Sequence, residues 1–304
     1  MKIGALVVTY NRLALLTEVV EALRRQTFAS EASDDTMQII VVNNGSTDAT
    51  AQWLKEQRDI VSIEQQNVGG AGGFHTGLRY VAENDYDACW LMDDDVVCRP
   101  EALTELVDAW RVVPTAGFLC SKVVGTDGRP MNVPMVDQRQ TIENYQDWME
   151  HIDRMMIKVE ASTFVSVLVP TSVIRQVGLP YKEYFIWGDD SEYTMRITRR
   201  YSAYMSCRSV VMHKRAIQGN LSFETETNRR RIDMFFYYFR NQTHCALLYR
   251  TKADTLKRIV IVTLVGFRML LHGRWRKACV AWKSQLAFLV FRPRVEYPKS
   301  SKLS

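Results

Sequence analysis

Short apolar runs alternate regularly with helical segments over residues 1–124, and this alternation restricts the fold more than any other feature. Five runs have the β-rich character of buried strands; they are Ile3–Tyr10, Met37–Asn44, Ile60–Asn67, Ala88–Val96 and Gly117–Val124. The segments between them show helical spacing of apolar residues or helix-start signals. Strands that alternate with helices are typical of a mainly parallel sheet covered on both faces. We therefore expect an α/β fold.

Polar clusters follow four of these runs. They are Thr9–Arg12, Asn43–Ser46, Asn67–Gly73 and Asp93–Asp95. The carboxyl ends of parallel strands meet at one edge of a sheet, and ligands bind there. The sequence therefore predicts a single site assembled from these clusters.

The third cluster belongs to a glycine-rich segment, Asn67–Leu78, which we expect to be a turn ahead of a helix around Leu78–Glu83. Backbone N–H groups in such a turn favour a diphosphate, although a glycine-rich turn without a ligand explains the pattern equally well. Further along, the sequence predicts a helical stretch near Tyr145–Met156 and strand character in Ala161–Pro170.

Three adjacent carboxylates, Asp93, Asp94 and Asp95, end the fourth apolar run. They repel one another, and a divalent cation would offset that repulsion. Because alternate side chains of an extended segment share a face, Asp93 and Asp95 would point together, as a Mg²⁺ or Mn²⁺ site requires. The alternative is a solvated acidic turn, but the apolar run before the motif favours the metal.

A second acidic pair, Asp189 and Asp190, follows an aromatic segment that contains Trp187. Low polarity around a carboxylate raises its basicity, as a general base requires. Helix capping is the alternative, although only one of the two residues is needed as a cap. His213 follows another apolar run and is either a metal ligand or a structural histidine.

Charge is divided unevenly along the 304 residues. From position 229 to the end there are 17 Lys/Arg and three Asp/Glu, against 22 and 31 in residues 1–228. We therefore expect a catalytic domain over 1–228 and a basic, amphipathic helical region over 229–304 that seeks an anionic partner. Its apolar runs favour a membrane surface, with no nucleic-acid partner. The longest uncharged run, Ile259–Phe267, is too short to span a bilayer.

The six cysteines form no C-x-x-C pair, and several lie in apolar runs. This pattern favours reduced thiols. Since no secretory leader is recognisable, we expect a cytoplasmic protein that is peripheral on the inner face of the cytoplasmic membrane.

Taken together, the motifs resemble those of family 2 glycosyltransferases with the GT-A fold, which has a Rossmann-like sheet. The resemblance covers residues 1–215 and rests on the segments VVTYNR, VVNNGSTDAT, NVGGAGGF, WLMDDDV, WGDDSEY and MHK. It looks most like the bacterial galactofuranosyltransferase and rhamnosyltransferase branch, and the glycine-rich loop and the W-x-DD-x-E-Y segment point to galactofuranose. The resemblance implies an inverting transfer from a nucleotide-diphosphate sugar, with UDP-galactofuranose as the favoured donor.

The resemblance also implies which residues bind the donor. These are Thr9, Tyr10, Asn11, Arg12, Asn43, Asn67, Gly69, Gly70, Asp93 and Asp94. Many relatives have an acidic residue where this chain has Asn43, and this departure leaves the nucleotide open, because an amide both donates and accepts hydrogen bonds.

The same resemblance implies the catalytic and acceptor residues. Asp93, Asp95 and His213 would hold Mn²⁺ or Mg²⁺, which stabilises the leaving diphosphate. Asp190 would take the proton of the acceptor hydroxyl, with Asp189 and Trp187 orienting the acceptor. The implied acceptor is a growing bacterial cell-surface glycan, lipid-linked or free, and a homo-oligomer is compatible with the sequence.

Two other functions fit parts of the sequence. The segment DDDVV matches the D-x-D-x-[TV] motif of haloacid-dehalogenase-like phosphatases, with Asp93 as nucleophile and Asp95 as acid/base. That motif normally follows the first strand of its fold, whereas here it follows the fourth. The second alternative is a non-catalytic module that binds a sugar nucleotide, against which the complete set of metal, base and loop residues argues.

Overall fold

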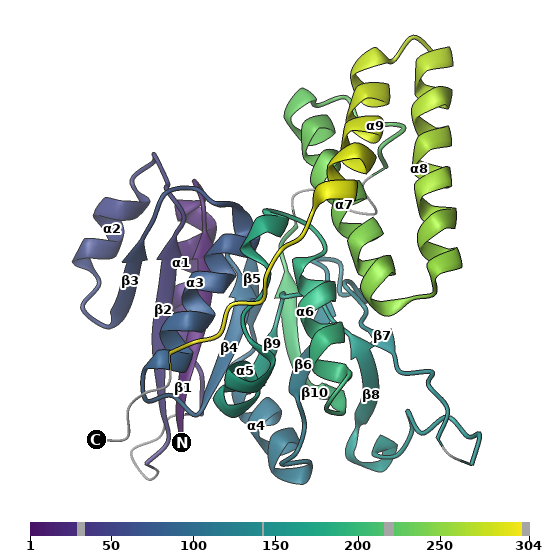
Figure 1. Ribbon diagram of the computed structural model, residues 1–304. Helices are drawn as coiled ribbons and strands as arrows, with labels where there is room; N and C mark the ends of the chain where they lie inside the picture. Colours follow the sequence, from purple (N-terminus) through teal and green to yellow (C-terminus); the bar gives the residue numbers. More distant parts are fainter. Residues whose placement is uncertain (29–33, 142, 216–221, 300–304) are drawn as a thin grey trace.

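The expected alternation of strands and helices is present in the computed structural model, which describes residues 1–28, 34–141, 143–215 and 222–299 (Figure 1). Over these residues, ten strands form one sheet between helical layers. The strands are β1 (Lys2–Thr9), β2 (Thr36–Asn43), β3 (Ile60–Glu64), β4 (Ala88–Asp93), β5 (Val96–Cys98), β6 (Phe118–Val124), β7 (Met135–Val136), β8 (Met156–Ala161), β9 (Val167–Pro170) and β10 (Ala203–His213). The helices of the layers are α1 (Leu13–Arg24), α2 (Thr50–Glu56), α3 (Gly69–Glu83), α4 (Ala102–Val112), α5 (Thr171–Val177) and α6 (Asp189–Thr198).

The sheet is parallel in its first half and mixed in its second. Its order is β3-β2-β1-β4-β9-β6-β10-β8-β7, with β5 paired to β10. The first four strands of this order pair in parallel, whereas β9 lies antiparallel between β4 and β6. The sheet is thus more mixed than the sequence predicts, because the pattern of the first five runs does not reveal that a later strand enters between β4 and β6.

Alternate residues of β1 face the two hydrophobic cores. Ile3, Ala5 and Val7 pack in one core with residues of α1 and α4, while Leu6 and Val8 pack in the other with residues of α3 and α5. Both faces of a central strand are therefore apolar and covered by helices, as expected for a parallel α/β sheet.

The expectation of a turn ahead of a helix at Leu78 is wrong, because helix α3 already begins at Gly69. Its glycines let the helix approach β1 closely. A Cβ on Gly73 would lie 2.3 Å from Val8 Cγ1, and one on Gly77 would lie 2.3 Å from Leu6 Cδ1. The glycines of this segment therefore serve helix–sheet packing.

The prediction of a helical stretch near Tyr145–Met156 is also wrong. The structure has turns there, a single 3₁₀ turn at Ile152–Arg154, and strand β8 from Met156 onward. No residue of the 3₁₀ turn is buried, so the segment has no apolar face to stabilise a longer helix. Met155, in the left-handed region at φ 58°, ends the turn.

Three long helices, α7 (Arg229–Tyr249), α8 (Lys252–Leu271) and α9 (Trp275–Val290), form the basic C-terminal region and stand above one end of the sheet (Figure 1). Gly266 of α8 packs directly against Trp282 of α9. The chain then returns across the α3 side, where Leu179 N–H donates to the Glu296 carbonyl over 2.8 Å. Among the described residues, no helix is both long and apolar enough to cross a membrane.

Candidate active site

Three metal-ligand candidates meet where β4, β5 and β10 come together. Asp93 ends β4, and the antiparallel pairing of β10 with β5 sets His213 opposite Val96, next to Asp95. One ligand atom each from Asp93, Asp95 and His213 lies within 4.8 Å of the others. The structure thus brings together residues separated by more than a hundred positions in the chain.

The hydrogen bonding of His213 leaves a place for a cation. Its Nδ1 lies 2.9 Å from Asn132 Oδ1, which makes Nδ1 the donor of this bond and turns Nε2 to the opposite side of the ring. Nε2 lies 3.0 Å from Asp95 Oδ1, a buried oxygen with no other partner among the described residues. Both atoms are of kinds that bind metal ions, and their closeness suits a divalent cation with nitrogen and oxygen ligands, such as Mn²⁺.

Asp94 is held by neighbours on β1 and α1. Its carboxylate accepts a 2.8 Å hydrogen bond from Thr9 Oγ1 and forms an ion pair with Arg12 at 3.0 Å. Arg12 also forms an ion pair with Asp95 at 3.0 Å. Thr9 is fully buried. Two of the residues expected to bind the donor therefore brace the acidic cluster from the first strand end.

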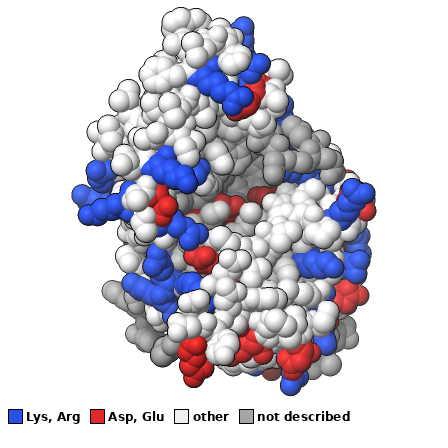
Figure 2. Space-filling model, turned by 90° about the vertical axis from the view of Figure 1, so that its right-hand side faces the viewer, with Lys and Arg blue, Asp and Glu red and all other residues white. Residues whose placement is uncertain are grey.

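The acidic cluster and the second acidic pair are electrostatically connected. Burial raises the pKa of Asp93 well above its usual range, and the charges of Asp95, Asp94, Asp190 and Asp189 raise it further. A cation bound there would relieve this repulsion. The two motifs therefore belong to one site. Figure 2 shows a hollow with acidic side chains inside it and basic ones along one edge.

The loop that carries Trp187 into the site has an unusual backbone. Phe185 and Trp187 both have positive φ, at 64° and 62°. Asn241 of α7, fully buried, holds this loop by donating from Nδ2 to the carbonyls of Tyr184, Ile186 and Trp187 over 2.8–3.1 Å. The aromatic face of Trp187 packs on Phe235 of α7, with ring centroids 5.3 Å apart.

Asp189 and Asp190 form the first turn of α6. Burial raises the pKa of both carboxyls, and for Asp189 the charge of Asp190 adds to the rise. Asp190 Oδ1 accepts hydrogen bonds from the N–H and the hydroxyl of Ser191, the N–H at 2.6 Å. A carboxylate with raised basicity at a helix start matches what a general base requires.

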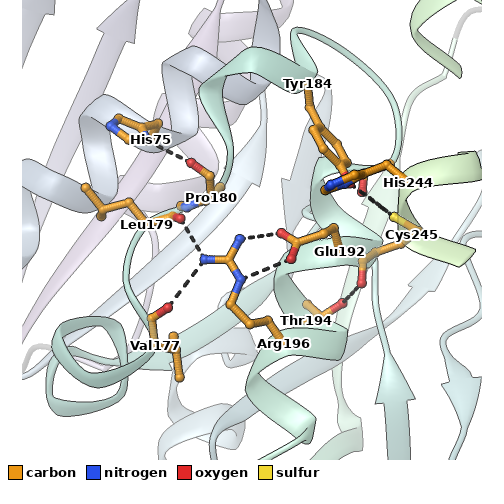
Figure 3. Close-up of polar contacts among 12 residues, drawn as sticks. His75, Val177, Leu179, Pro180, Tyr184, Glu192, Thr194, Arg196, His244 and Cys245 are labelled. Atoms are coloured by element: carbon orange, nitrogen blue, oxygen red, sulfur yellow. Dashed lines mark hydrogen bonds and ion pairs between the residues drawn. The ribbon is translucent and has the colours of Figure 1, made fainter. Parts of the chain in front are cut away.

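Helix α6 contains a buried ion pair between Glu192 and Arg196 (Figure 3), and Glu192 also links the helix to the C-terminal region. Glu192, with no exposed surface, accepts from Arg196 and from the Tyr249 hydroxyl at 2.7 Å. Arg196 also donates to the carbonyls of Val177 and Leu179. This network holds the helix that carries the acidic pair.

The remaining donor-site candidates lie around the other strand ends. Asn11 Oδ1 accepts from Thr47 N–H at 2.6 Å, and Asn43 donates to Glu64 at 2.8 Å. Asn67 Oδ1 caps the start of α3 by accepting from Gly69 N–H at 2.9 Å. Tyr10 is exposed, and a Cβ at Gly70 would meet open space.

Close packing also explains Gly69. It has φ +79°, and a Cβ there would lie 2.1 Å from the carbonyl oxygen of Phe185. The N-terminus of α3 thus touches the loop that precedes the acidic pair, and Ala71 N–H donates to the same carbonyl over 3.1 Å.

Sequence reasoning missed two asparagines that organise the site: Asn132 orients His213, and Asn241 holds the Trp187 loop. Asn44, within the predicted cluster Asn43–Ser46, accepts from Val68 N–H and donates to the Gly69 carbonyl. Asn241 could have been noticed as a polar residue within an aromatic helix. The other histidines for which the structure shows buried partners are structural: His75 bonds to the Pro180 carbonyl and His244 to the Tyr184 hydroxyl (Figure 3).

Comparisons with known proteins agree with this geometry. The family model "Glycosyl transferase family 2" matches residues 5–159, just over half of the chain. Galactofuranosyltransferase GlfT1 of Mycobacterium tuberculosis H37Rv is 25% identical over 211 residues, which cover 67% of this chain and 66% of that protein, slightly less than two thirds of its length. GlfT1 of Mycolicibacterium smegmatis is 27% identical over 213 residues, 67% of either chain.

Among solved structures, S. aureus TarS 1-349 in complex with UDP superimposes with a TM-score of 0.56 at 14% identity, over 99% of this chain and 98% of TarS. The same fragment in complex with UDP-GlcNAc gives 0.55. At this identity the likeness establishes the fold alone. The family match disfavours the phosphatase alternative: the chain belongs to glycosyl transferase family 2 and has the GT-A fold.

Proposed function

We propose that this glycosyltransferase is an inverting, metal-dependent enzyme that transfers galactofuranose from UDP-galactofuranose to a hydroxyl of a bacterial cell-surface glycan. The single observation that carries the proposal is the meeting of the Asp93, Asp95 and His213 ligand atoms beside Asp189 and Asp190, whose pKa values are raised by desolvation. The relatives named galactofuranosyltransferases support the sugar, and TarS bound to UDP supports the nucleotide.

The division of work among the residues follows from their surroundings. Mn²⁺ or Mg²⁺, held by Asp93, Asp95 and His213, supplies positive charge for the leaving diphosphate. Asp190 takes the proton from the acceptor hydroxyl, since burial has raised its basicity. Trp187, fixed by Asn241, presents an apolar face on which the acceptor sugar is oriented.

A substitution at Asp190 tests the base assignment. We expect Asp190→Asn to abolish UDP release from UDP-galactofuranose in the presence of acceptor while UDP binding with Mn²⁺ stays within a few fold of wild type, because only the proton acceptor is lost. Asp153→Asn, an exposed carboxylate on the 3₁₀ turn, is the matched control and should keep full activity. Turnover like that of wild type in Asp190→Asn would remove the assignment.

The donor is tested by competition between sugars. In thermal-shift titrations with Mn²⁺, UDP-galactofuranose should stabilise the protein more than dTDP-rhamnose or UDP-hexopyranoses at equal concentration, since tighter binding to the native state raises its stability. Equal or greater stabilisation by dTDP-rhamnose would refute the galactofuranose assignment while leaving the transferase activity intact.

The C-terminal helices supply a reason to propose membrane association. Large apolar side chains are exposed along α8 and α9; they include Leu256, Val260, Leu264, Phe267, Leu271, Leu286, Leu289 and Val290. Lys and Arg side chains lie among them, and in Figure 2 the upper part of the molecule is largely uncharged with basic patches. Exposed apolar side chains flanked by basic ones are typical of helices that lie on an anionic bilayer.

Vesicle binding tests this placement. We expect co-sedimentation with phosphatidylglycerol vesicles that weakens with salt, and a loss of at least tenfold in the Leu264→Glu/Leu289→Glu variant. Val112→Glu, an exposed valine on α4, is the matched control. If the double variant sediments as well as the control, the helices do not contact the membrane.

A further inference from the structure

Three buried serines form a chain of hydrogen bonds across the sheet, outside the candidate site. Trp90 Nε1 donates to Ser166 Oγ over 2.9 Å, the hydroxyl oxygens of Ser166 and Ser121 lie 2.6 Å apart, and those of Ser121 and Ser209 lie 2.7 Å apart. The Ser209 hydroxyl donates to the carbonyl of Ala102, at the start of α4, over 2.8 Å. None of these five residues is more than 2% exposed. The chain therefore runs entirely through the interior.

The two ends of this serine chain fix the direction of its hydrogen bonds. An indole N–H can only donate, and a carbonyl oxygen can only accept. Each hydroxyl between them must therefore accept from the side of Trp90 and donate toward Ala102. All three hydroxyls are then fully used, so the loss of any one leaves a buried neighbour without its partner.

The serine chain joins the two strands that carry the metal-ligand candidates. Trp90 lies three residues before Asp93 on β4, and Ser209 lies four residues before His213 on β10. The sheet order here is β4-β9-β6-β10, so two further strands lie between them (Figure 1). The other two serines belong to β6 and to the residue directly before β9, and they bridge this interval.

Strand β10 needs such a link because its pairing with β6 is interrupted. Residues up to Ser206 pair in register, but the pairing resumes only at Val210, so the three described residues between them are left without a partner on β6. A shift of one residue turns the side chains of a strand to the other face of the sheet. A slip at the interruption would therefore turn His213 away from the acidic cluster. Ser209, the last of the three unpaired residues, is where the serine chain attaches to β10.

We propose that the serine chain is a positioning device for the metal site: it holds β10 in the register that brings His213 to Asp93 and Asp95. This rests on the proposed function, because it concerns the ligands of the same cation. The serines do not contact that cation and act only through His213. Apolar side chains would fill the core without selecting a register, whereas hydroxyls are satisfied only when all of them meet at fixed positions.

Mn²⁺ affinity distinguishes positioning from a contribution to stability alone. Ser121→Ala removes the central hydroxyl and should weaken Mn²⁺ binding by about 3- to 10-fold, less than loss of a direct partner of a ligand. Electron paramagnetic resonance of free Mn²⁺ measures this at a temperature at which every variant is folded. Ser209→Ala should have a similar effect, and the double variant should bind about as weakly as the weaker single variant, because both substitutions break one chain.

A buried serine outside the chain supplies the matched control. Ser284 on α9 has no exposed surface, and its hydroxyl donates to the Ala281 carbonyl over 2.6 Å. Ser284→Ala should therefore lower the free energy of unfolding in urea titrations, as the chain variants do, but leave Mn²⁺ affinity unchanged.

The outcomes separate this proposal from the proposed function. If the wild-type protein binds Mn²⁺ and both single chain variants bind it equally tightly, the serine chain does not position the site, and the proposed function stands. An equal loss of affinity in Ser284→Ala would show that the effect follows stability, and would overturn the positioning role as well. Absence of Mn²⁺ binding by the wild-type protein would instead count against the metal site itself, and the positioning role would fall with it.

Discussion

The contact between Asn132 and His213 provides a sensitive test of the proposed metal site. Asn132 Oδ1 accepts from His213 Nδ1 at 2.9 Å, and this bond directs Nε2 toward Asp95. Outer partners of this kind change metal affinity by about 10- to 100-fold, or roughly 1.4–2.7 kcal/mol. We therefore expect loss of the Asn132 acceptor to weaken Mn²⁺ binding by that factor while the three ligands remain.

The backbone at this position decides which substitutions are informative. Asn132 has φ +47°, a region in which a residue such as alanine costs about 1–2 kcal/mol. Asn132→Gly removes the hydrogen-bond acceptor without this strain. Asn132→Asp keeps an acceptor in either orientation of the side chain, because both terminal atoms of a carboxylate are oxygens. Mn²⁺ affinity, measured by electron paramagnetic resonance of free Mn²⁺, should fall in the glycine variant and be kept or increased in the aspartate variant.

Two results would refute the reasoning. If Asn132→Gly bound Mn²⁺ as tightly as wild type, the orientation of His213 would not depend on this bond. If His213→Gln also left affinity unchanged, the histidine would not be a ligand. Asn144→Gly, a second asparagine with positive φ outside the site, controls for effects of the glycine itself.

Three further predictions follow from the packing and the charges. Glu192→Gln removes the counter-ion of buried Arg196 and should lower the free energy of unfolding by about 3–5 kcal/mol in urea titrations, with a smaller loss in the Glu192→Gln/Arg196→Met variant. Gly77→Val should lower the free energy of unfolding by about 1–3 kcal/mol, because the valine overpacks against Leu6, whereas Gly70→Ala should leave it nearly unchanged. Thermal melts of the two variants measure this difference. In metal-free buffer, burial raises the pKa of Asp189, so the folded state binds more protons than the unfolded chain. The melting temperature should therefore fall as the pH rises above about 4, and this fall should be smaller in the Asp189→Asn variant.

Periodicity predicted the layered α/β architecture because both faces of β1 to β4 must be covered. It misplaced the start of α3, since glycine has low intrinsic helix propensity, and the tertiary packing of Gly73 on Val8 and of Gly77 on Leu6 cannot be read from the local pattern. It also missed the insertion of β9 between β4 and β6, which depends on contacts between residues about 80 positions apart for β4.

The candidate site was predictable where a motif is continuous and not where it depends on distant partners. The acidic cluster and the pair at the start of α6 lie at the expected ends of elements, and Asp93, Asp95 and His213 converge. Asn132 lies in an irregular segment with no period, so nothing in the sequence marks it as the partner of His213.

The boundary expected at residue 228 stays a prediction, and the contacts across it bear on what the C-terminal region does. Asn241 and Tyr249 of α7 hold the Trp187 loop and Glu192, which lie on either side of the acidic pair, each two positions from it. A region that only attached the enzyme to a surface would not need to contribute hydrogen bonds to the loop before the acidic pair and to the helix that carries it. We therefore expect the helices of residues 229–304 to have two functions: the exposed apolar side chains of α8 and α9, with basic residues among them, suit a bilayer surface, and α7 holds the elements that position the acidic pair.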